Sequence, residues 1–124
     1  MVKLFGKRNC IIAALIILLL GVFYFVDWRP QPVKVVNHYL KSVQNKDAQD
    51  AYPILHIQNK NSKLDFETFK GTLYSDPLIE YKINGSSKLN ENTYQVLVDI
   101  NMNGWETDRT FEVRRIDGNW KIIF

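Results

Sequence analysis

The apolar and polar positions divide the 124-residue chain into an uncharged apolar run at 10–26 and a longer part with periodic patterning. A helix rises about 1.5 Å per residue, so the run reaches roughly 25 Å, near the lower limit for crossing a hydrocarbon core of about 30 Å. The pattern predicts a transmembrane signal-anchor helix at 10–27 behind a cytosolic basic tail at 1–9. By the positive-inside rule the N-terminus stays in the cytosol, because three basic residues precede the run: Lys3, Lys7 and Arg8.

A cleaved secretory signal is the alternative, since it shares the basic start and the apolar run. Cleavage requires small residues just beyond the run, whereas the residues at 23–30 are bulky throughout. Tyr24 and Trp28 also lie where an interfacial aromatic belt would sit. The sequence therefore favours an uncleaved anchor, a linker at 28–32 and an extracytoplasmic domain at 33–124.

The first predicted helix of this domain follows directly after the linker. Apolar residues recur at helical spacing from Val33 to Val43. Pro32 is well placed in the first helical turn, and polar Asn45-Lys46-Asp47 interrupts the pattern. The spacing predicts an amphipathic helix of about 13 residues.

Two further helices are predicted before the first strand. Asp47 is placed to cap a second helix, which Pro53 interrupts after about one turn and which His56 closes. Ser62 followed by Asp65 resembles a capping box that opens a third helix. The apolar residues of that third helix form its predicted inner face: Leu64, Phe66, Phe69 and Leu73.

The rest of the chain is predicted to be a meander of strands. Asn103-Gly104 and Asp117-Gly118 are strong hairpin signals, because both central positions of such a turn need positive φ. The first turn places Arg109 opposite Val98 and Phe111 opposite Val96. Both turns independently place Phe111 and Val113 on one apolar face, and a slip of one residue would expose the whole set.

An earlier strand joins this meander through a turn at Glu91-Asn92. That turn would place Leu89 opposite Tyr94 and Ile83 opposite Ile100, with Ile79 and Tyr81 continuing the apolar face. The opposite face is mostly polar, with Leu97 and Ile123 as exceptions. The predicted fold is α+β: the N-terminal transmembrane helix, then three helices packed on a curved four-stranded antiparallel sheet.

Charge changes the picture of possible partners. The net charge of +3 comes from the N-terminal cluster, because all 13 acidic residues and 13 of the 16 basic ones lie after residue 26. The balanced charge of the domain does not support nucleic-acid binding. The single cysteine, Cys10, precedes the domain, so its stability must come from packing, as suits a bacterial cell envelope.

The order of these elements resembles the nuclear transport factor 2-like (cystatin-like) superfamily, in its small membrane-anchored bacterial extracytoplasmic form. The segments that carry the resemblance are Val36–Asp47, Ala51–Leu55, Leu64–Phe69 and Gly118–Phe124. The resemblance implies a cone in which the sheet wraps the helices around a cavity that is filled or holds a ligand. It implies an Asp base and an acid pair in enzymatic members, and no such set matches positions in this chain.

Four residues are candidates for contact with a ligand or partner. Arg109 is predicted on the apolar face, where a charge is costly unless it is paired or reaches solvent. Tyr81 and Thr107 are predicted near it, forming a cone-mouth site for an anionic group. Trp105 follows a hairpin tip, where it either covers the core edge or serves as a contact anchor.

No catalytic, metal or cofactor site is predicted. His38 and His56 have no acidic partner at fixed spacing, and Asp99 falls on the outer polar face. No nucleophile has a recognisable base beside it.

We therefore expect a non-enzymatic accessory or interaction protein, anchored in a cell membrane with its domain outside and contacting an envelope protein. A homodimer through the outer face of the sheet is an additional expectation. The alternatives are a small-molecule binding protein that uses the cone cavity and, after it, an enzyme of the isomerase or dehydratase type.

Overall fold

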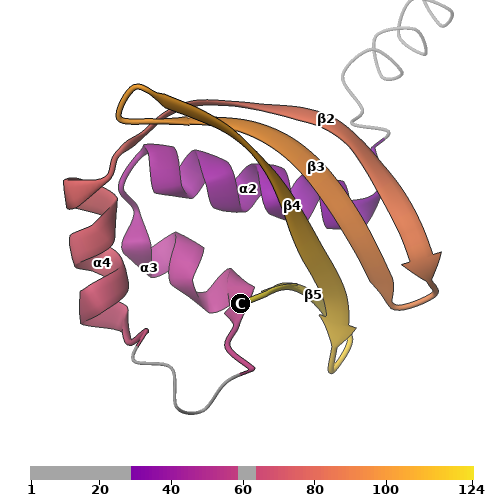
Figure 1. Cartoon of the computed structure of the whole chain (residues 1–124). Helices are drawn as coiled ribbons and strands as arrows, with labels where there is room; N and C mark the ends of the chain where they lie inside the picture. Colours follow the sequence, from indigo (N-terminus) through magenta and orange to yellow (C-terminus); the bar gives the residue numbers. More distant parts are fainter. Residues whose placement is uncertain (1–28, 59–63) are drawn as a thin grey trace, which may run out of the picture.

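A computed structural model of the chain describes residues 29–58 and 64–124, which form three α-helices and a curved sheet. The helices lie inside the curve of the sheet, and α2 runs across its inner side (Figure 1). Within the described residues, none of the helices is both long enough and apolar enough to cross a membrane. The predicted anchor at 10–27 lies outside the described residues.

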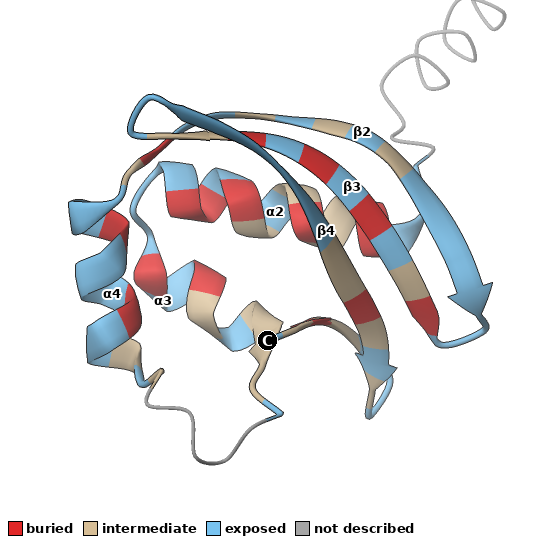
Figure 2. Cartoon of the chain, viewed as in Figure 1, coloured by how far each residue is buried: buried red, intermediate tan, exposed pale blue. Residues whose placement is uncertain are grey.

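The first helix of the domain, α2 (Gln31–Gln44), confirms the predicted amphipathic helix. Pro32 lies in its first turn, where the missing N–H group costs nothing. Its buried residues include Val33, Val36 and Leu40, which recur at helical spacing. This stripe faces the sheet and supplies one wall of the core (Figure 2).

The second helix is short, as predicted. α3 (Ala48–Ala51) begins at Asp47, whose carboxylate accepts a hydrogen bond of 3.2 Å from the Asp50 amide. Pro53 then falls in a single 3-10 turn, η2 (Tyr52–Ile54), and the chain becomes extended at Leu55. Because the helix ends early, Leu55 and His56 are free to pair with the sheet.

The third helix, α4 (Phe66–Ser75), starts later than the predicted capping box indicates. The cap is Asp65, whose carboxylate accepts a hydrogen bond of 2.7 Å from the Thr68 amide. Ser62 lies outside the described residues. Phe69 and Leu73 are buried as predicted, whereas the side chains of Leu64 and Phe66 are half-buried at the edge of the core.

The prediction of a four-stranded antiparallel sheet is wrong, because the sheet has five strands and is mixed. The additional strand is β1 (Leu55–His56), which pairs in parallel with β5 (Asn119–Ile123). Two residues are too few to show a strand periodicity, and their partner lies far along the chain. The order across the sheet is β1-β5-β4-β3-β2.

The last two hairpins have the predicted register. β3 (Thr93–Met102) pairs with β4 (Trp105–Ile116), with Val98 opposite Arg109 and Val96 opposite Phe111. Gly104 and Gly118 have φ of +87° and +82°, as two-residue turns require. Val96 and Val113 are fully buried, which confirms the apolar face that the two turns defined.

The register of β2 (Leu78–Asn90) differs from the prediction. Lys88 instead of Leu89 lies opposite Tyr94, and Ile83 lies opposite Val98. Three register shifts along this strand are responsible, because a bulge places two residues of one strand against one of the other. Ile79 and Leu89 are consequently exposed.

Candidate functional site

The interior of the curved sheet is filled by aromatic rings. Tyr39 on α2 stacks on Phe69, with 6.5 Å between ring centroids, and meets the edge of Phe111 on β4 at 6.3 Å. Tyr52 continues the cluster, with centroids 5.5 Å from Phe69 and 5.7 Å from Phe66. These ring contacts join four elements, α2, η2, α4 and β4. Open space remains beside the aromatic cluster.

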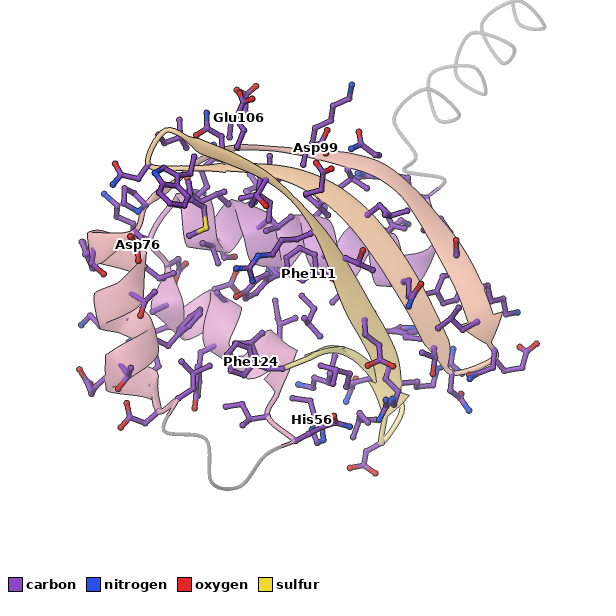
Figure 3. The ribbon with its side chains drawn as sticks, viewed as in Figure 1. His56, Asp76, Asp99, Glu106, Phe111 and Phe124 are labelled. Atoms are coloured by element: carbon purple, nitrogen blue, oxygen red, sulfur yellow. The ribbon has the colours of Figure 1, made fainter. Side chains whose placement is uncertain are left out.

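That space is a groove of about 510 Å³ between β4, the C-terminal half of α2 and the end of α4. Its floor is apolar, formed by residues such as Leu40, Ile100 and Met102. Figure 3 shows Phe111 on the inner side of β4, facing α2, where it forms part of the groove wall. The groove therefore combines apolar depth with a polar rim.

Arg109 supplies the positive charge of that rim. It lines the groove from β4 and is exposed, so its guanidinium reaches solvent from an otherwise apolar face. Among residues 29–58 and 64–124, no carboxylate forms a salt bridge with it. Burial raises the pKa of Tyr39 to about 12, although the Arg109 charge lowers it, so this hydroxyl stays protonated beside the cation.

Trp105 lines the same groove at the hairpin tip, opposite Met102 in the register. Its exposed fraction is 81%, the largest among the exposed large hydrophobic residues of the described chain. An indole that covered the core edge would be mostly buried. The structure thus brings together two of the four predicted contact residues, Arg109 and Trp105.

The other two predicted residues are not among those that line this groove, although Thr107 lies between Trp105 and Arg109 at the alternate position of β4. Tyr81 and Thr107 flank Ile100 on either side in the sheet and border a second hollow of about 390 Å³. The Tyr81 hydroxyl donates a hydrogen bond of 2.9 Å to the Asn37 side-chain oxygen, which ties β2 to α2. Tyr81 therefore holds the fold together and does not complete the site around Arg109.

The outer face of the sheet carries a pair of facing carboxylates. Asp99 on β3 lies directly opposite Asp108 on β4, and the outward direction of Asp99 is visible in Figure 3. Hydrogen bonds from Asn84 and Asp108 lower the pKa of Asp99. The hydrogen bond to Asp99 and the Asp99 charge raise the pKa of Asp108. Lys82 on β2 lies opposite Asp99 on its other side, and its charge also lowers the pKa of Asp99. Glu106 lies beside Asp108 on β4, so the β4 part of this outer face is acidic.

A polar network that the sequence did not indicate joins α2 to α3. Asp50 accepts a hydrogen bond of 2.5 Å from the Ser42 hydroxyl, and its carboxylate lies 2.7 Å from His38 Nε2. Asp50 stands between the other two, so His38 is not placed to activate the hydroxyl. Within the described parts of the chain, His, Cys, Asp and Glu form no cluster suited to a metal ion.

Sequence reasoning also missed two groove residues, Tyr39 and Asp76. Tyr39 lies beside the apolar stripe of α2, and this position was the only feature of the sequence that could have indicated that it lines the groove. Asp76 caps the C-terminal end of α4, and the carbonyl of the next residue, Pro77, accepts a hydrogen bond of 3.1 Å from the Asn103 amide, which places Asp76 beside the groove. Figure 3 shows Asp76 near the hairpin end of the sheet.

No protein-family profile matches the sequence, and no curated protein matches it significantly. Solved structures do resemble the fold. A candidate NTF2-like transpeptidase from Campylobacter jejuni has a TM-score of 0.56 at 11% identity, over 77% of this chain and 99% of that one. An NTF2-like protein of unknown function from Cytophaga hutchinsonii has a TM-score of 0.54 at 12% identity, over 79% and 91%.

A DUF4783 family protein from Bacteroides uniformis has a TM-score of 0.50 at 15% identity, over 70% of this chain and 89% of that one. Sequence identities this low carry information about the fold alone. The helices inside a curved sheet and these structural neighbours together show that the domain has the nuclear transport factor 2-like fold.

Proposed function

We propose that this protein is a non-enzymatic interaction protein whose domain binds a partner protein through the groove. In this proposal the apolar N-terminal segment holds the domain at the outer surface of a cell membrane. The observation that carries the proposal is the exposed Trp105 beside Arg109, at the rim of an interior that aromatic rings already fill. Tryptophan and arginine are enriched among the residues that dominate protein interfaces.

The filled interior supports binding at the rim instead of deep enclosure. Phe111, Tyr39 and Phe69 occupy the centre of the cone, where enzymes of this fold are implied to hold a substrate. A partner surface could bury the Trp105 indole and the Arg109 guanidinium while the rings stay in place. In this proposal the domain stays near the membrane, because α2 begins at Gln31, only a few residues after the apolar segment.

Site-specific photo-crosslinking of the full-length protein in intact membranes tests this proposal. A photoreactive amino acid at position 105 should yield a defined protein adduct, identified by mass spectrometry. The same group at Leu89, which is exposed near the far end of β2, is the matched control and should not yield that adduct. Arg109→Leu in the position-105 protein should reduce the yield several-fold, since desolvated arginines are common hot spots.

An adduct that is equally strong from both positions, or is unaffected by Arg109→Leu, would contradict the proposal. A shielded domain in protease-accessibility measurements on intact cells would contradict the membrane orientation.

A small-molecule site is the second candidate, and the size of the groove favours it. Ligand pockets are typically about 300–1,000 Å³, and the groove at about 510 Å³ lies within that range. The cation and the protonated Tyr39 hydroxyl suit an aromatic carboxylate. Such compounds should then raise the melting temperature of the wild-type protein and leave Arg109→Leu unchanged. Equal stabilisation of both proteins would exclude binding at this groove.

A further inference from the structure

The groove borders a free strand edge. β5 pairs only with the C-terminal part of β4, from Val113 to Ile116. The preceding part, 105–112, has β3 on one side and no described strand on the other. Figure 1 shows this half of β4 as the margin of the sheet facing the helices. A strand edge that has no neighbour is a template for pairing with another chain.

The hairpin register determines which backbone groups face that edge. In an antiparallel ladder, hydrogen-bonded and non-hydrogen-bonded pairs alternate, and the pair flanking a two-residue turn is hydrogen-bonded. Trp105, Thr107 and Arg109 therefore direct their N–H and C=O groups to β3. The intervening residues Glu106, Asp108 and Thr110 direct theirs to the free edge.

We propose, building on the interaction function above, that the partner contributes an extended segment that pairs as an added strand with the edge of β4. The segment carries basic side chains at alternate positions, on the outer face, and apolar side chains between them. An added strand would lie about 4.8 Å from β4, over the mouth of the groove. Main-chain hydrogen bonds then supply affinity, and the alternating side chains supply specificity.

Charge identifies the outer-face side chains of the segment. Glu106 and Asp108 project from the outer face of this half-strand, and Asp99 lies behind Asp108. The strand also contains Glu112, which pairs with Arg114 at 3.0 Å and is thereby compensated. Lysine or arginine beside Glu106 and Asp108 would form opposite-charge cross-strand pairs, each of which stabilises a sheet.

The inner-face side chains of the segment would meet the groove. Thr107 and Arg109 also belong to this face of β4, so the apolar side chains of the segment would pack on the apolar lining while the Arg109 guanidinium stays at the rim. Trp105, Phe111 and Met102 offer apolar surface there, with Tyr39 beneath them. Burying apolar side chains against this surface would remove the exposed indole from water. The two faces of the edge therefore select a pattern that alternates basic and apolar residues.

A second copy of this chain does not fit the edge. Two copies related by a two-fold axis would pair their β4 edges antiparallel, about an axis at one of the residues 106–110. Each such register sets like charges opposite one another, which destabilises a sheet. For an axis at residue 106, 107, 108, 109 or 110, the facing like-charged pair is respectively Glu106–Glu106, Glu106–Asp108, Asp108–Asp108, Arg109–Arg109 or Asp108–Glu112.

The test uses the full-length protein in mild detergent and an acetylated peptide of alternating lysine and valine. Amide hydrogen exchange is followed by NMR during titration of the peptide. Strand addition should slow the exchange of Glu106, Asp108 and Thr110, with little change at Thr107 and Arg109, whose amides already bond to β3. The matching peptide of glutamate and valine should bind at least about tenfold more weakly.

Two variants sharpen the test. Thr110→Pro removes an N–H group at the free edge and should weaken lysine–valine binding by about tenfold. The charge reversal Glu106→Lys with Asp108→Lys changes two exposed side chains and should make the glutamate–valine peptide the tighter ligand. Persistent preference for the lysine–valine peptide in the reversed protein would overturn the proposal.

The two proposals fail separately. Peptide-induced shifts at the Trp105 indole without slower exchange at the three edge amides would overturn strand addition and leave groove binding intact. Absence of lysine–valine binding at millimolar concentration would also overturn strand addition. The interaction function itself would be overturned by a different result, the absence of any protein adduct from position 105 of the otherwise unchanged protein.

Discussion

The two halves of β4 continue one strand but have different surroundings. From Trp105 to Thr110 every residue is exposed, whereas from Phe111 to Ile116 all but Arg115 are at least partly buried. Both halves pair with β3, from Trp105 through Arg114, so the difference does not come from that side. Figure 2 shows the change from exposed to buried along the strand.

The neighbour on the other side accounts for the difference. Val113 lies opposite Ile122 of β5, and β5 is itself held by β1 through Leu55. The Lys121 ammonium donates a hydrogen bond of 2.6 Å to the Pro53 carbonyl, which fixes β5 to the 3-10 turn. Residues 105–112 have no such neighbour among the described residues, and the β4 residues that line the groove all lie in this part: Trp105, Arg109 and Phe111. Stability and availability for binding are thus divided along one strand.

A pair of proline substitutions should separate the two halves most strongly. The register directs the Arg114 N–H to β5 and the Thr110 N–H to the free edge. Arg114→Pro should destabilise the protein by about 3 kcal/mol, since it removes a ladder bond and leaves a carbonyl of β5 without its donor. Thr110→Pro should cost less than about 1 kcal/mol, as proline is tolerated at strand edges.

Urea unfolding of the full-length protein, followed by far-ultraviolet circular dichroism, measures both changes. Similar losses for the two variants would show that the edge of Trp105–Glu112 is occupied in the folded protein.

Side-chain truncation should give the second-largest contrast. Val113 is fully buried, and Val113→Ala should cost about 2 kcal/mol through lost burial and an incompletely filled space. Trp105 is far larger but 81% exposed, so Trp105→Ala should change the free energy of unfolding by less than about 0.5 kcal/mol. A substantial destabilisation by Trp105→Ala would assign the indole a structural role and remove it from the candidate interface.

Much of the part of β4 that pairs with β5 could be predicted from the sequence. The turns at Asn103-Gly104 and Asp117-Gly118 require particular backbone conformations, and together they determine which face Val113 occupies. The cap of α3 by Asp47 and the interruption at Pro53 are equally local effects. Local chemistry of this kind is readable without knowledge of the tertiary structure.

The failures have a common origin in contacts between distant segments. β1 is a strand only because β5 offers it an edge, and the three bulges of β2 shift its pairing with β3 in a way that the turn at Glu91-Asn92 does not specify. The hairpin register placed Arg109 correctly, but the bulges of β2 place Tyr81 opposite Ile100 instead of at the groove. Tyr39 and Asp76 line the groove through contacts between segments that are distant in sequence, which no sequence spacing specified.

The smallest predicted effect concerns the facing carboxylates of Asp99 on β3 and Asp108 on β4. Asp99 and its charge raise the pKa of Asp108, so the folded state favours protonated Asp108. That contribution to stability is complete below the ordinary aspartate pKa of 3.8 and is lost as pH rises through the raised value. The lowered pKa of Asp99 acts oppositely, since its contribution is present above the ordinary pKa and is lost as pH falls.

Asp108→Asn should therefore raise the melting temperature slightly at neutral pH, because an amide can still donate to Asp99 but carries no charge. The gain should shrink as pH approaches 3.8, where the wild-type Asp108 is itself becoming protonated. Glu112→Gln is the matched control from the same face: it loses the ion pair with Arg114 and should lower the melting temperature slightly or leave it unchanged. A gain from Asp108→Asn that does not vary with pH would show that repulsion from Asp99 is not its cause, and the preference of this edge for basic segments would then have to rest on Glu106.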